Sequence, residues 1–319
     1  MRSEFDFIHH IKEKYGLRHI GDDCAVLPSD AQTDLLVTSD MLAEEVDFRL
    51  DWTTPELLGH KALAVSLSDI AAMCGVPNWA LLSIGIPEHL WKGDFLDGFY
   101  AGWHKLADLY GVELIGGDVS RVAGKLVIDS TVLGKVARGK AILRSGAKPG
   151  DGIYVTGSLG GAAVGLRLLE SGRRLASDDS PESRLIDRQM APHPRLDLAP
   201  RLNADAGITS MIDISDGLSS DLRHICSASG CGAEIDAVKI PIDPDICVLD
   251  TPFDDKIDLA LNGGEDFELL FTADPKKFSA PADAEITRIG TVTATVGDIE
   301  LIRDGERRLL APGGYLHFG

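Results

Sequence analysis

The stretch Asp213-Ile214-Ser215-Asp216-Gly217-Leu218 places two aspartates around the end of an apolar run. The run itself, residues 209–214, predicts a strand, and residues 218–229 predict a helix. A strand that ends in an acidic turn and continues into a helix is typical of an α/β domain. Because Asp213 and Asp216 lie on either side of the strand end, one cation could bind both of them.

Five other segments share this pattern of an acid that follows an apolar run or lies in a glycine turn. They are Gly21-Asp22-Asp23, Thr38-Ser39-Asp40, Ser68-Asp69-Ile70, Gly116-Gly117-Asp118 and Gly263-Gly264-Glu265-Asp266. A carboxylate cannot bind a phosphate directly, but a divalent cation can bridge the two groups. Two carboxylates 4 Å apart repel by about 4 kcal/mol at an effective dielectric constant near 20, so a converging set requires cations. The pattern predicts magnesium-dependent phosphate chemistry, with ordinary Asp-Gly turn formation as the alternative for any single segment.

Composition and missing motifs narrow the class of protein. The net charge of −19, from 50 acidic and 31 basic residues, excludes nucleic acid and anionic membranes as expected partners. The chain has no GxxxxGK[ST], GxGxxG, HExxH, EF-hand or GxSxG motif. The N-terminus lacks the pattern of a secretory signal, and no apolar run is long enough to span a bilayer. Five cysteines without a CxxC pair predict reduced, buried thiols in a cytoplasmic protein.

The chain divides into two expected domains, residues 1–140 and 141–319, at the Gly- and Pro-containing stretch 138–151. The first is expected to hold helices over 4–15, 54–74 and 94–110 and strands over 35–39, 79–86, 112–115 and 125–136. The second is expected to hold a strand over 152–156, a helix to about 170, a surface loop over 172–184 and strands near 233–240, 267–273 and 285–292. Asp69 lies on the apolar face of its helix, where an acid is costly unless it is paired or bound to metal.

Taken together and in order, these segments resemble the thiamine-monophosphate kinase family. The resemblance rests on the N-terminal Glu4-Phe5 helix, Gly21–Val26, Thr38–Asp40, Ser68–Met73, Gly116–Asp118, Arg144–Asp151, Asp213–Leu218, Gly263–Leu270 and the closing Gly314–Phe318. It implies a mixed α/β, two-domain fold shared with aminoimidazole-ribonucleotide synthetase and selenophosphate synthetase. It also implies a homodimer in which the N-terminal sheets of two subunits pair, with ATP sites near the interface. The implied reaction converts ATP and thiamine monophosphate into thiamine diphosphate and ADP by direct in-line transfer.

The resemblance also implies roles for individual residues. Magnesium ligands would be Asp23, Thr38, Ser39, Asp40, Asp69, Asp118, Asp213 and Asp216, of which Asp40, Asp118, Asp213 and Asp216 carry the catalysis. ATP would contact Gly117, Asp118, Arg144 and Ser215, with Tyr100 a looser match. Thiamine monophosphate would lie against Asp47, Glu265 and Tyr315, since carboxylates favour its cationic ring and a tyrosine can stack on it.

Two positions depart from the family pattern. Cys74 stands where the family usually has glycine, and Val119 stands where it usually has threonine.

A sister enzyme of the same fold could act on another acceptor, although Cys24 does not lie in the glycine-rich segment expected of a selenophosphate synthetase. A non-catalytic acidic metal-binding protein is the other alternative, but its ligands would normally lie in one contiguous loop.

Overall fold

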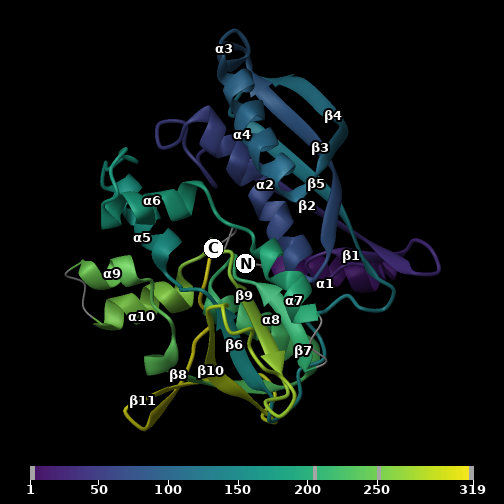
Figure 1. Ribbon diagram of the computed structural model, residues 1–319, viewed down its shortest axis with the longest axis vertical. Helices are drawn as coiled ribbons and strands as arrows, with labels where there is room; N and C mark the ends of the chain where they lie inside the picture. Colours follow the sequence, from purple (N-terminus) through teal and green to yellow (C-terminus); the bar gives the residue numbers. More distant parts are fainter. Residues whose placement is uncertain (1–3, 204–206, 250–252, 316–319) are drawn as a thin grey trace.

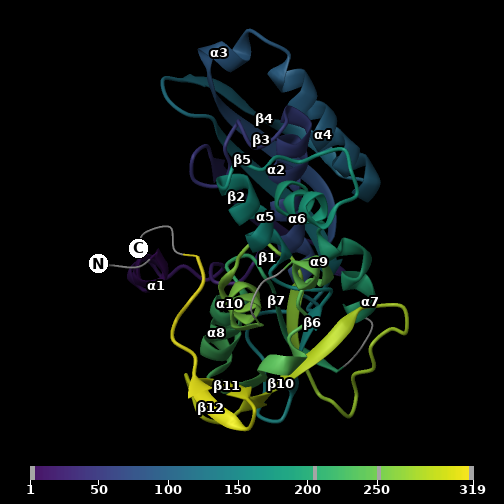
Figure 2. The same ribbon diagram turned by 90° about the vertical axis from the view of Figure 1, so that its left-hand side faces the viewer.

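The computed structural model describes residues 4–203, 207–249 and 253–315 and shows two domains, each built on its own sheet (Figure 1). The sequence-derived expectation of a mixed α/β fold with two sheets is confirmed. Figures 1 and 2 show the sheets in opposite halves of the molecule, with α2 reaching from one half towards the other.

The N-terminal sheet has the strand order β1-β2-β5-β3-β4. In that order its strands are Ala25–Pro28, Thr33–Ala43, Val127–Ala137, Val76–Pro87 and Glu113–Val122; the helices of this half are α1 (Glu4–Tyr15), α2 (Pro55–Ala72), α3 (Glu88–Trp91) and α4 (Phe95–Tyr110). Helix α2 packs on β2 and β5 and is itself covered by α4. Strand β4 pairs with β3 alone and so forms an edge of the sheet.

Helix α2 is the centre of this half, and its sequence explains its limits. Thr54 caps the first turn by accepting a hydrogen bond from the backbone N–H of Leu57 at 3.3 Å, and Pro55 occupies the first helical position. Nearly every later residue of the helix is buried. The helix ends before Cys74, which adopts the left-handed conformation with φ +55°. That conformation favours glycine, so the departure at position 74 falls where the backbone geometry is most demanding.

The C-terminal sheet has the order β12-β11-β8-β10-β6-β9-β7. In that order its strands are Glu306–Leu309, Ile299–Arg303, Gly232–Asp236, Ile286–Thr293, Gly152–Thr156, Leu269–Ala273 and Ile208–Asp213. Its helices are α5 (Gly161–Glu170), α6 (Pro181–Met190), α7 (Ala199–Asn203), α8 (Leu218–Ser229), α9 (Pro244–Val248) and α10 (Phe253–Asn262), with short 3-10 turns η1 (Arg195–Asp197) and η2 (Ala237–Lys239). Helix α2 contacts β7, η1 and α6, so it packs directly against this second half.

The boundaries predicted for several elements were wrong. Asp40 lies inside β2 and not at its end, and Gly116, Gly117 and Asp118 lie within β4 and not in a turn. The expected loop over 172–184 contains the start of α6, because Ser180 caps a helix that begins at Pro181. The strand expected near 233–240 ends at Asp236.

The cysteines and the apolar helices of the described residues bear on two further expectations from the sequence. All five cysteines are free thiols; four are buried, whereas Cys247 is exposed, which corrects the expectation that all were buried. Within the described ranges, no helix has the length and apolar character that a membrane span requires.

Candidate active site

Three carboxylates from distant parts of the chain converge between the two halves of the molecule. Asp23 precedes β1, Asp69 lies near the end of α2, and Asp213 ends β7. One carboxylate oxygen from each lies within 4.8 Å of the others, a spacing suited to a shared cation. The structure therefore brings together the acids of three of the six segments, and a fourth segment joins them through Thr38, which donates to Asp69. Asp213 clusters with Asp23 and Asp69 and not with Asp216.

Short hydrogen bonds fix the orientation of this acid cluster. Ser68 donates from Oγ to Oδ2 of Asp213 at 2.6 Å, and the hydroxyl of Thr38 donates to Asp69. Arg144 donates to Oδ1 of Asp23 from Nη2 at 2.6 Å and from Nε at 3.2 Å. Sequence reasoning missed Ser68, whose place directly before Asp69 in the same motif is the signal that could have identified it.

Burial makes the ionised form of these acids costly. It raises the pKa of Asp69 well above its usual range, the pKa of Asp213 to about 7 and the pKa of Asp40 to about 6. Neighbouring carboxylates raise the pKa of each group further. Among the described residues, Oδ2 of Asp23 and Oδ2 of Asp40 are buried without a hydrogen-bond partner. Buried, mutually repelling oxygen donors with unused lone pairs fit a hard divalent cation.

The two hydroxyl residues before Asp40 face opposite sides of the sheet. Side chains alternate along a strand, so Thr38 is buried towards α2 whereas Ser39 is exposed on the other face. There Ser39 Oγ lies 2.9 Å from Thr131 Oγ1 and 3.3 Å from both oxygens of Asp129. The Ser39 hydroxyl therefore points away from the acid cluster, which counts against the expected role of this side chain as a ligand there.

A second possible cation site contains Asp216, Asp221 and His224, with ligand atoms within 4.8 Å of one another. Asp221 is buried in the first turn of α8, where its Oδ2 accepts the backbone N–H of Gly217 at 3.1 Å and of Asp216 at 3.3 Å. Burial raises the pKa of Asp221 well above its usual range and lowers the pKa of His224 to about 4. Sequence reasoning missed Asp221 and His224, although the two lie one turn apart on the helix predicted directly after Asp216.

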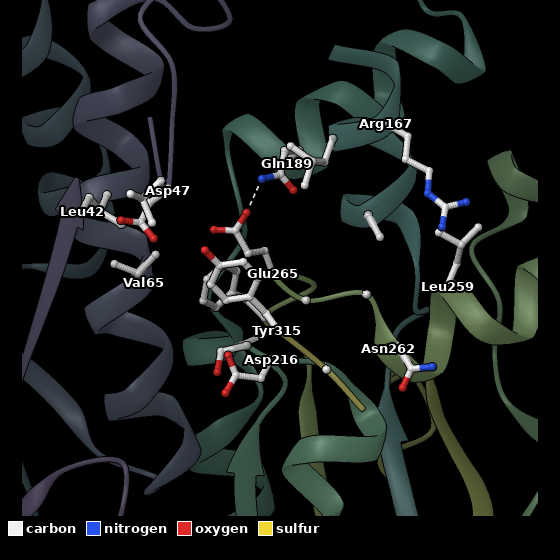
Figure 3. A pocket seen from close by; sticks show the side chains of 18 of the residues that line it. Leu42, Asp47, Val65, Arg167, Gln189, Asp216, Leu259, Asn262, Glu265 and Tyr315 are labelled. Carbon is white, nitrogen blue, oxygen red and sulfur yellow. Dashed lines mark hydrogen bonds between the residues drawn. The ribbon is translucent and has the colours of Figure 1, made fainter. Parts of the chain in front are cut away.

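A cavity of about 530 Å³ opens between the two halves next to these acids. Its lining includes all three residues expected to face thiamine monophosphate, Asp47, Glu265 and Tyr315, together with Asp40, Ser215 and Asp216. Figure 3 shows Asp47 arriving from the N-terminal half, opposite Glu265, Tyr315 and Asp216. The cavity thus joins the expected acceptor residues to two of the expected metal ligands.

The wall that carries Glu265 is held by backbone contacts to the acidic turn. The N–H of Glu265 donates to the carbonyl of Ser215 at 2.8 Å, and the N–H of Phe267 donates to that of Ile214 at 2.9 Å. Glu265 and Phe267 both have positive φ, +66° and +50°, which is uncommon for residues with side chains. Gly264 permits the close approach, because a Cβ there would lie 2.5 Å from the carbonyl oxygen of Ser215.

The residues expected to bind ATP lie in three different places. Tyr100, Gly117, Asp118 and Val119 line a separate hollow of about 490 Å³ at the exposed edge strand β4. Arg144 lies in the acid cluster and Ser215 in the cavity. Within one chain, the structure does not bring the five ATP residues together.

Comparison with known proteins identifies the family. The AIR synthase related protein N-terminal domain matches residues 21–136, and its C-terminal domain matches residues 148–301. Thiamine-monophosphate kinase of Bacillus subtilis is 37% identical over 328 residues, covering 99% of each chain. That of Escherichia coli K12 is 40% identical over 308 residues, covering 94% of this chain and 91% of its own. This chain belongs to the thiamine-monophosphate kinase family.

Solved structures of thiamine-monophosphate kinases share the whole fold. AaThiL complexed with AMPPCP and TMP superposes with a TM-score of 0.87 at 33% identity, covering 99% of this chain and 97% of that one. The thiamine-monophosphate kinase of Stenotrophomonas maltophilia gives 0.80 at 38% identity, covering 96% and 98%. Hydrogenase maturation protein HypE in complex with ATP gives 0.70 at 19% identity, which shows a common fold alone.

Proposed function

We propose that this chain transfers the γ-phosphoryl group of ATP to thiamine monophosphate, giving thiamine diphosphate and ADP. One observation supports this above the others. In a chain of this family, the cavity that holds Asp47, Glu265 and Tyr315 is also lined by Asp40 and Asp216 and lies beside buried carboxylates that need cations. We assign Asp47, Glu265 and Tyr315 to thiamine monophosphate, and Tyr100, Gly117, Asp118, Arg144 and Ser215 to ATP.

Several magnesium ions are proposed to occupy the carboxylate groups. Asp23, Asp69 and Asp213 would hold one shared ion, with Thr38 and Asp40 beside them; Asp216 and Asp118 would serve further ions. Bound magnesium would neutralise the repelling phosphates and stabilise charge that develops in the transition state. Magnesium in phosphate-transferring sites is bound by carboxylates, waters and substrate phosphates together, so acids spread over several segments suit more than one ion around a polyphosphate.

The chain's own residues are proposed to position the reactants and exclude water. The acceptor phosphate of thiamine monophosphate is already an anionic oxygen nucleophile, so little general-base catalysis is required. The cavity walls would hold the thiamine portion and so direct this phosphate towards the acid cluster, whose carboxylates could reach it only through bound cations. With γ-labelled ATP in a single turnover, label should appear in thiamine diphosphate and never on the quenched protein. Protein-bound label that forms and decays at the rate of turnover would refute direct transfer.

Stabilisation by magnesium should depend on pH. Because burial raises the pKa of Asp40 to about 6 and of Asp213 to about 7, the folded chain retains protons there that the unfolded chain has lost. Metal-free stability should therefore fall as the pH rises from about 4 to 7. Magnesium requires the ionised carboxylates, so its increase in Tm should be several degrees at about pH 8 and near zero at about pH 5. Thermal scans at matched ionic strength test this; equal shifts at both pH values would contradict it.

A homodimer formed through the N-terminal sheets is proposed as the active form. Edge strand β4 is exposed along most of its length, and on β3 the side chain of Leu81 is 37% exposed. Pairing there would cover these groups and place the hollow around Asp118 at the subunit interface. Light scattering should show a dimer for the parent chain and a monomer for Leu81→Asp. The matched control, Leu109→Asp on α4, replaces a leucine that is 66% exposed and should stay dimeric; a monomeric parent would contradict the proposal.

A further inference from the structure

We infer that Lys61 is a positioning residue of the substrate cavity, where its ammonium group fixes the carboxylate of Glu265. The inference rests on the proposed function, since it concerns how thiamine monophosphate is held. Lys61 lies on α2 and is 1% exposed, the one lysine buried to this degree within the described residues. Lysine is rarely buried, and a buried ammonium is costly unless its donors are used.

The donors of Lys61 are used on the segments that build the cavity wall. Its Nζ lies 2.8 Å from Oε1 and 3.0 Å from Oε2 of Glu265. It also donates to the carbonyl of Gln189 at 3.3 Å and, at the long distance of 3.5 Å, to that of Asp47. One ammonium group from the N-terminal half thus ties together the segment after β2, the end of α6 and the loop before β9.

Glu265 is held in one orientation by these contacts. Its backbone has φ +66°, and the side-chain amide of Gln189 donates to its Oε2 (Figure 3). The Glu265 side chain nevertheless remains 28% exposed and lines the cavity. Lys61 and Gln189 therefore orient the carboxylate without covering it. This is the arrangement of a group prepared to accept a hydrogen bond from a ligand.

The Lys61 charge also changes what Glu265 can recognise. Because the Lys61 ammonium offsets the Glu265 carboxylate, this pair contributes little net negative charge to the cavity. The negative charge of the cavity comes instead from Asp47 and Asp216. Glu265 is then a directed acceptor for a donor group of the substrate, such as the amino group of its pyrimidine ring, and not an electrostatic partner for the cationic ring. Recognition by a directed acceptor that the bound substrate would cover discriminates strongly against analogues without the donor.

Lys61→Met tests the inference, because methionine preserves the length and apolar packing but removes the ammonium. The KM for thiamine monophosphate should rise about tenfold or more, because a charge-assisted contact is lost, while the KM for ATP stays within about twofold. Lys125→Met is the matched control: Lys125 also contacts two glutamates, Glu44 and Glu45, but lies on the surface. That variant should leave both KM values unchanged.

A double-mutant cycle separates positioning from general stability. In a Glu265→Gln background, adding Lys61→Met should change the KM for thiamine monophosphate by less than about twofold, because Lys61 acts through Glu265. Independent, multiplicative effects would overturn the inference, as would a normal KM for thiamine monophosphate in folded Lys61→Met.

A second variant and the activity of the parent chain complete the test of Lys61. If Lys61→Met alone does not fold, Gln189→Leu removes a neutral donor to Glu265 without leaving a charge unpaired. It should raise the same KM several-fold, and an unchanged KM would overturn the inference. Turnover by the parent chain is measured first in the same assay. A parent chain that makes no thiamine diphosphate would refute the proposed function and this inference with it, whereas an active parent with unaffected variants would refute the inference alone.

Discussion

Asp213→Asn is expected to reduce turnover by about 10³-fold, because bound metal supplies several kcal/mol of transition-state stabilisation. Asp213 is 3% exposed and shares its possible cation site with Asp23 and Asp69. Asparagine has the same shape and keeps an oxygen that can accept the hydrogen bond from Ser68. It lacks the second anionic oxygen, so the predicted effect is on metal binding and not on packing.

The same substitution should leave the metal-free protein at least as stable as the parent. Burial raises the pKa of Asp213 to about 7, so its ionisation in the folded state opposes folding above that pH. Removing the charge should increase Tm at about pH 8 by several degrees, since 1 kcal/mol corresponds to a few degrees in a chain of this size. Thermal scans without metal and turnover assays on one preparation measure both quantities.

Asp187→Asn is the control for this pair of measurements. Partial desolvation also raises the pKa of Asp187, but this residue is exposed on α6 and lines a different hollow. Its replacement should leave turnover within about threefold of the parent. Normal turnover in Asp213→Asn, or a large loss of stability without metal, would contradict the assignment of Asp213 as a metal ligand.

Gly117→Ala is expected to destabilise the N-terminal half by about 3 kcal/mol or more, because neither the backbone nor the neighbouring strand can accommodate the methyl group. Gly117 lies in β4 with φ +149°, and a Cβ there would lie 1.8 Å from the carbonyl oxygen of Leu82 on β3. The alanine can be accepted only if β4 separates from β3. Denaturant unfolding should show the loss of stability, and light scattering should show a loss of the proposed dimer.

Gly124→Ala provides the matched control in the connection between β4 and β5. A Cβ at Gly124 would meet no atom within 4 Å. Its replacement should change the free energy of unfolding by less than about 0.5 kcal/mol. Equal stability of the two variants would refute the account of why glycine is needed at position 117.

The sequence predicted elements whose signals are local. The helices predicted over 54–74 and 94–110 are confirmed as α2 and α4, because the capping Thr54 and the terminal Gly111 are local signals. Local patterns could not show that β2 and β4 continue through their acidic motifs, because strand length depends on the partner strands. Gly117 of β4, expected to contact ATP, also makes room for the neighbouring strand β3.

The candidate site was predictable in its residue types but not in its grouping. That Asp213 lies beside Asp23 and Asp69 depends on how α2 packs against β7, which no motif encodes. The partners that orient the acids, such as Ser68 and Lys61, come from helix positions that also suit an apolar core. Only the packed structure shows that their polar atoms are directed at a carboxylate.

The most direct test is a steady-state turnover assay with purified protein, ATP and thiamine monophosphate, in which thiamine diphosphate is quantified as magnesium is varied. We expect product in proportion to enzyme, saturation by both substrates, and complete loss of turnover when magnesium is chelated, with recovery when it is restored. Folded protein that binds ATP yet makes no thiamine diphosphate at any magnesium concentration would refute the proposed activity. The chain would then be expected to act on an acceptor other than thiamine monophosphate. Product formed equally well without a divalent cation would contradict the role assigned to the buried carboxylates.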